Sequence, residues 1–146
     1  MSERTEIENW VVSQFSGLVA HGFTEPLVKR EDWFTVIDWL GDTIAIEIEL
    51  DWRDYDVFVL VVKLENGKLP KGYYMEDGRL LRIHLEEIIR KKFSGVCRDE
   101  VKLFRERRKQ KKSNKDCVAS LKDRISVYKD VLMSCVGWIV KEKTLF

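Results

Sequence analysis

Residues 43–64 place the tightest limit on the fold of this chain. They begin with acidic side chains that alternate with the apolar residues Ile44, Ile46, Ile48 and Leu50, and this period indicates a strand with one buried and one polar face. After a short turn, residues 57–62 are apolar at every position, which indicates an interior strand covered on both faces. The two segments together predict an antiparallel hairpin at the centre of a sheet.

The turn of this hairpin gathers acidic and aromatic side chains. A two-residue loop at 52–53 would place Asp51 opposite Asp54, and Glu49 opposite Asp56. Like charges in direct cross-strand pairs are destabilising, so we expect a cation, a basic segment of this chain or a basic partner to offset them. The alternative is a solvated tip, where exposed charges cost little. We name this predicted partner-binding surface the acidic hairpin tip; it comprises Glu49, Asp51, Trp52, Asp54, Tyr55 and Asp56.

Helices are predicted before and after this sheet. Residues 3–20 carry apolar side chains at steps of three and four, as in an amphipathic helix. Residues 32–40 alternate like a strand, and residues 85–92 and 115–141 predict a short and a long helix. The predicted fold class is therefore α+β: an N-terminal helix, an antiparallel sheet of three to five strands, and C-terminal helices.

The length of 146 residues suggests a single domain. Residues 1–93 hold the helix, the sheet and the short helix, and residues 94–146 form a helical tail with a basic segment at 105–115. The long last helix carries an apolar seam that alternates steps of three and four, formed by Val118, Leu121, Ile125, Tyr128, Leu132, Cys135 and Ile139. We expect this seam either to pack on the sheet or to form a homodimer interface through residues 118–139.

Charge is distributed unevenly along the chain, although the net charge is only +1. Residues 1–56 carry 13 acidic and 4 basic side chains, and the remaining residues carry 12 acidic and 22 basic ones. The negative charge of the first part and the positive charge of the second can be neutralised within the molecule, between subunits, or by a separate partner for each.

Catalytic, metal and cofactor motifs are absent from the sequence. It has no glycine-rich phosphate loop, its two histidines, His21 and His84, form no zinc motif, and its three cysteines are widely spaced. A D…(D/E)xK nuclease pattern fails because Val61 stands where a carboxylate is needed, two residues before Lys63. We therefore predict no catalytic residue, no metal and no cofactor. An enzyme that uses His84 with Glu86 or a cysteine is a distant alternative.

A basic segment predicts a second candidate function, which is nucleic-acid binding through residues 98–115. Its cationic side chains are sufficient to neutralise several phosphates, and they are Arg105, Arg107, Arg108, Lys109, Lys111, Lys112 and Lys115. The segment has no interleaved aromatic residue for base stacking. The pI of about 7.7 is also low for a dedicated nucleic-acid-binding domain. The alternative is a solvated segment that rests on the chain's own acidic face.

The function predicted from these patterns is that of a small cytoplasmic, non-catalytic protein-binding module. The first residues lack the basic-then-apolar pattern of a secretory leader, and no apolar run reaches the roughly 18 residues of a membrane span. An acidic surface with an aromatic anchor suits a basic partner protein. Small acidic-faced inhibitors of basic toxins or nucleases, such as bacterial immunity proteins, have surfaces of this character. By that analogy, we expect an inhibitor of this type.

Overall fold

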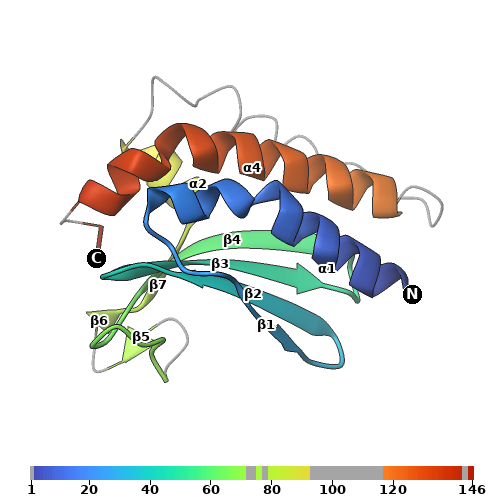
Figure 1. Ribbon diagram of the computed structural model, residues 1–146, viewed down its shortest axis with the longest axis horizontal. Helices are drawn as coiled ribbons and strands as arrows, with labels where there is room; N and C mark the ends of the chain where they lie inside the picture. The colour runs from blue at the N-terminus through green and yellow to red at the C-terminus, as the bar shows by residue number, and fades with distance from the viewer. Residues whose placement is uncertain (1, 72–74, 77–78, 93–116, 143–144) are drawn as a thin grey trace.

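The computed structural model describes residues 2–71, 75–76, 79–92, 117–142 and 145–146. They form an α+β fold with an N-terminal helix, a five-stranded antiparallel sheet and a long last helix, which confirms the predicted class. The first and last helices lie side by side across one face of the sheet (Figure 1). The core of the molecule lies between these helices and the sheet.

The sheet has the strand order β1-β2-β3-β4-β7, and each neighbouring pair is antiparallel. Its strands are β1 (Leu27–Arg30), β2 (Phe34–Leu40), β3 (Ile44–Asp51), β4 (Asp56–Lys63) and β7 (Arg82–His84). A separate ladder joins β5 (Met75–Glu76) to β6 (Arg79–Leu80). The predicted hairpin is formed by β3 and β4. As predicted, β4 is an interior strand with buried apolar residues on both faces.

The helices are α1 (Glu3–Gln14), the 3-10 helix η1 (Ser16–His21), α2 (Leu85–Lys92) and α4 (Cys117–Lys141). Within the described segments, no helix has both the length and the apolar character that crossing a bilayer requires.

The N-terminal helix is shorter than the predicted span of residues 3–20. Ser2 caps it, because its Oγ accepts a hydrogen bond from the N–H of Thr5 at 3.2 Å. Its α-helical part ends at Gln14, and the chain continues as the tighter η1. The adjacent Ser16 and Gly17 are weak helix formers, which accounts for the change.

The apolar seam of α4 lies in the core of its own chain. Six of its seven residues are buried, and Val118 is partly buried against the same core; the six are Leu121, Ile125, Tyr128, Leu132, Cys135 and Ile139. The structure therefore supports the packing of this seam within one chain. The homodimer through residues 118–139 stays a prediction, and it would have to use α4 side chains outside the seam.

The face of β3 that carries its acidic side chains is more buried than the alternating pattern predicted. Glu47 and Glu49 are both buried on this face. The guanidinium of Arg82 reaches across β4 and donates to both carboxylate oxygens of Glu47, at 2.8 and 3.1 Å. The prediction of a wet face is wrong at these positions, because an arginine 35 residues away in sequence compensates the buried charge.

Candidate protein-binding site

The turn between β3 and β4 contains four residues, Trp52 to Tyr55, and not two. Asp51 is consequently the cross-strand partner of Asp56, and Glu49 that of Phe58. The pairing of Glu49 with Asp56 that a two-residue loop would give is wrong. Only one carboxylate pair, Asp51 with Asp56, remains directly opposed in this hairpin.

Local hydrogen bonds explain why the turn is longer. Oδ1 of Asp51 accepts from the backbone N–H groups of Arg53, at 2.9 Å, and Asp54, at 3.3 Å. Aspartate favours turns because its carboxylate can take over such backbone donors. Tyr55 completes the turn in the left-handed region, at φ 49. One oxygen of the Asp51 carboxylate is therefore occupied by hydrogen bonds within the turn.

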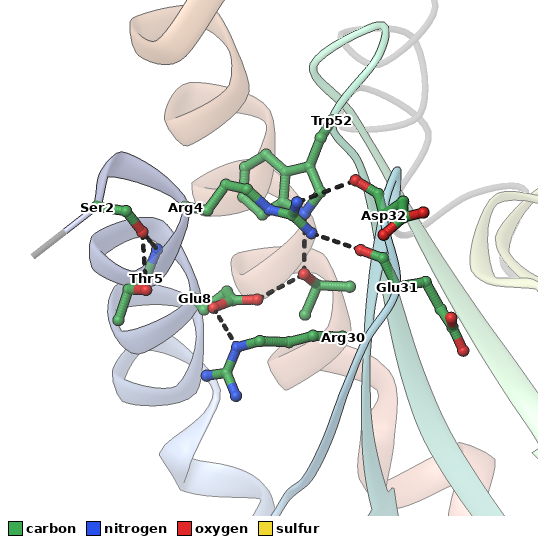
Figure 2. Close-up of polar contacts among 9 residues, drawn as sticks. Ser2, Arg4, Thr5, Glu8, Arg30, Glu31, Asp32 and Trp52 are labelled. Carbon is green, nitrogen blue, oxygen red and sulfur yellow. Dashed lines mark hydrogen bonds and ion pairs between the residues drawn. The ribbon is translucent and has the colours of Figure 1, made fainter.

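Trp52 does not project from this turn. Its side chain is only 8% exposed, and its Nε1–H donates to Oγ1 of Thr35 at 2.8 Å. The guanidinium of Arg4 covers the ring at 5.1 Å from its centroid (Figure 2). The prediction of Trp52 as an exposed contact residue is wrong, because the indole gains more from burial with a partner for its N–H than from solvent.

A buried carboxylate joins this end of the sheet to α1. Glu8 is 1% exposed and accepts from Nε of Arg30 at 2.9 Å and from Oγ1 of Thr35 at 2.5 Å (Figure 2). Arg4 also donates to the carbonyl oxygens of Glu31, at 2.8 Å, and Asp32, at 3.0 Å. These bonds fix the turn between β1 and β2 against α1 and against Trp52.

The other residues of the acidic hairpin tip differ in how accessible they are. Asp56 is ion-paired with Arg124, a fully buried arginine of α4 that also donates to the carbonyl of Tyr55. Glu49 is buried, whereas Asp54 is exposed and Asp51 and Tyr55 are partly exposed. A basic residue of the same chain thus offsets part of the negative charge predicted for the hairpin tip. A contribution of this kind, from within the chain, was among the possibilities that the sequence left open.

Tyr55 is tied to the start of α1. Its hydroxyl donates to a carboxylate oxygen of Glu3 at 3.1 Å. This hydrogen bond, with a smaller effect of burial, raises the pKa of the Tyr55 phenol because it stabilises the protonated form. The bond places the Glu3 carboxylate at the same end of the molecule as the hairpin turn.

Two exposed aromatic residues at this end were missed by sequence reasoning. Trp33, in the turn between β1 and β2, is 53% exposed, and Phe34, the first residue of β2, is 44% exposed. The Trp33 carbonyl accepts from the N–H of Trp52 at 2.9 Å, and Phe34 is the cross-strand partner of Asp51. The predicted strand spanned residues 32–40 and therefore included Trp33. The observed strand begins at Phe34, which leaves Trp33 in the turn.

The turns between β1 and β2 and between β3 and β4 lie next to each other at the end of the molecule that holds the N-terminus (Figure 1). Their surface has an exposed aromatic centre and exposed or partly exposed carboxylates from two turns. We call it the Trp33 surface and define it by Trp33, Phe34, Glu31, Asp32, Asp51 and Asp54. Lys29 lies 3.6 Å from the Glu31 carboxylate, in an exposed ion pair that contributes little stability.

A buried carboxylic acid lies on the opposite face of the sheet from α1 and α4. Asp38 is 5% exposed and is the cross-strand partner of Glu47. Burial, and then the charge of Glu47 and a hydrogen bond to it, raise the pKa of Asp38 from 3.8 to about 8. Oδ1 of Asp38 has no hydrogen-bond partner in the described part of the chain. Asp38 is therefore protonated at neutral pH.

The structure describes only some of the residues on which the other predicted functions depend. The basic segment 98–115 lies outside the described residues, so nucleic-acid binding through it stays a prediction. Glu86 accepts from the hydroxyl of Tyr128 at 2.5 Å, and the His84 ring packs at 5.9 Å from the Phe58 ring. No group of histidine, cysteine and acidic side chains among the described residues has an arrangement that could hold a metal ion.

No protein-family model, no curated protein and no solved structure matches this chain, so its function is inferred from its own residues.

Proposed function

We propose that this protein is a non-catalytic protein-binding module that docks a basic partner protein on the Trp33 surface. The observation that carries the proposal is the exposure of Trp33 and Phe34 between turns that carry carboxylates. Tryptophan is the residue type most enriched among the side chains that dominate binding energy at interfaces. An aromatic centre with a polar rim is also the usual anatomy of such an interface.

The rigidity of this surface supports the proposal. The turn that holds Trp33 is fixed by Arg4, by the Trp52 N–H and by the buried Glu8. A surface held in one conformation before binding loses less conformational entropy when the partner docks. The hydrogen bonds that hold this turn therefore favour binding of a partner at Trp33, in addition to stabilising the fold.

Charge supports a basic partner. Residues 1–56, which include the whole Trp33 surface, carry 13 acidic and 4 basic side chains, and an acidic excess remains when the buried Glu8, Asp38, Glu47 and Glu49 are left out. An excess of one sign on the docking half of a protein speeds the approach of an oppositely charged partner and disfavours others. A basic toxin or nuclease, held by this chain as an immunity-type inhibitor, is the specific partner class proposed from the sequence, and it fits this charge.

The experiment is an affinity capture from cells that make the protein, with the full chain as bait. We expect a basic protein to bind the wild type and to be released by raised salt, because screening weakens the attraction between exposed charges. The double variant Asp32→Asn and Asp54→Asn is expected to capture less of it. Asp42→Asn, an exposed aspartate in the turn at the other end of the sheet, is the matched control. Equal capture by the wild type and all variants would contradict a role of these carboxylates in binding.

A further inference from the structure

The exposed ring of Trp33 is already in contact with a cation from the same chain. The guanidinium of Arg53 lies 4.9 Å from the ring centroid of Trp33. Arg53 is itself exposed, and the guanidinium has no ion pair among the described residues. This arrangement is a cation–π contact at the surface, where such contacts are weak.

A second contact of the same kind differs in its setting. Arg4 lies 5.1 Å from the ring centroid of Trp52, but Trp52 is buried and Arg4 is held by two backbone carbonyls. Arg4 is partly exposed and is held in place by these two hydrogen bonds. Arg53 is an exposed residue of the turn between β3 and β4, no hydrogen bond from its guanidinium is seen among the described residues, and the Trp33 residue that it covers is itself 53% exposed.

The surroundings of Trp33 suit a cation from another molecule. The ring face attracts a guanidinium or an ammonium through its quadrupole. Asp32 precedes Trp33 and Asp54 follows Arg53 in the sequence, and the charges of these two exposed residues add a negative potential at this end of the molecule. The position that Arg53 occupies therefore shows where the positive side chain of a partner would be held.

We infer that Trp33 is a subsite for an arginine or lysine side chain of the partner, and that Arg53 occupies this subsite in the free protein as an internal competitor. This inference rests on the proposed function, since it names what the partner places on the Trp33 surface. A partner cation must displace Arg53 before it stacks on the ring. Removal of Arg53 should therefore strengthen binding, although it removes a side chain from the docking surface.

The test is a titration of the full-length protein with a capped octa-arginine peptide at low ionic strength. Binding is followed by isothermal titration calorimetry, which reports the affinity of the wild type and of every variant in the same way. Arg53→Gln is expected to bind about two- to fivefold more tightly than the wild type, the range that corresponds to an exposed cation–π contact. Trp33→Leu is expected to bind more weakly than the wild type.

Removal of one positive charge also strengthens attraction for the peptide in a general way, so a matched control is needed. Lys68→Gln removes the same charge from an exposed residue in the turn after β4, at the other end of the sheet from Trp33. The gain for Arg53→Gln must exceed the gain for Lys68→Gln. Equal gains, or weaker binding by Arg53→Gln, overturn the competition but leave the proposed function standing if Trp33→Leu still loses affinity. Equal binding by the wild type and Trp33→Leu overturns both.

Discussion

Replacement of Asp38 by asparagine probes the buried acid on the face of the sheet away from α1 and α4. The carboxyl group of Asp38 is 5% exposed and lies beside Glu47, whose charge is already paired with Arg82. Burial and the neighbouring Glu47 carboxylate raise the pKa of Asp38 to about 8. The native protein thus keeps a proton that the unfolded chain releases near pH 4.

The sign of the effect on stability follows from this difference in proton binding. Since the native state binds more protons between about pH 4 and pH 8, the free energy of unfolding falls as pH rises through that range. The slope from this group is about 1.4 kcal/mol per pH unit. At pH 7 the accumulated cost is on the order of 4 kcal/mol as an upper limit. A domain has only about 5–15 kcal/mol of stability, so this cost is large.

An asparagine at position 38 keeps the shape of the side chain, stays neutral at every pH and can donate to Glu47 as the protonated acid does. We expect the stability of Asp38→Asn relative to the wild type to rise by up to about 1.4 kcal/mol for each pH unit from pH 5 towards pH 8. Urea unfolding followed by tryptophan fluorescence at unit steps from pH 5 to pH 9 measures the difference. Asp42→Asn, an exposed aspartate, is the control and should show no such trend. A difference between wild type and Asp38→Asn that is constant with pH would refute a protonated Asp38.

Two other predictions concern the buried network and the basic segment. Glu8→Ala leaves Arg30 and Thr35 without their acceptor, so the midpoint of urea unfolding should fall by the equivalent of about 1–3 kcal/mol; an unchanged midpoint would contradict the role of Glu8. If the segment 98–115 binds nucleic acid, fluorescence anisotropy should detect DNA or RNA binding that weakens steeply with salt and with Arg107→Gln and Arg108→Gln. Absence of binding at low salt removes that alternative.

The fold was largely predictable from periodicity. The alternation at residues 44–50 and the continuous apolar run at 57–62 correctly predicted β3 and β4. The turn at Asn66 and Gly67 follows from local pattern in the same way, because both residues adopt the positive φ that an Asn-Gly pair favours, 53 and 77. These strands and this turn are determined by residues close together in the sequence, so the local sequence pattern was sufficient to predict them.

The candidate site was much less predictable, because it depends on contacts between distant residues. Trp52 and Trp33 each follow an aspartate in sequence, yet Trp52 is buried and Trp33 is exposed. The difference is set by α1, which supplies Arg4 over Trp52 and Glu8 beside Thr35. The length of the hairpin turn likewise depends on one carboxylate, that of Asp51, and its change by two residues shifted every predicted acidic pair.

The most direct test of the account is the affinity of the captured partner for two variants, measured by isothermal titration calorimetry. Trp33→Ala truncates the centre of the Trp33 surface, whereas Val140→Ala truncates an exposed apolar residue near the end of α4, at the other end of the sheet. We expect Trp33→Ala to raise Kd by about thirtyfold or more, as for a side chain worth at least 2 kcal/mol, and Val140→Ala to leave Kd unchanged. An unchanged Kd for Trp33→Ala would contradict docking at this surface.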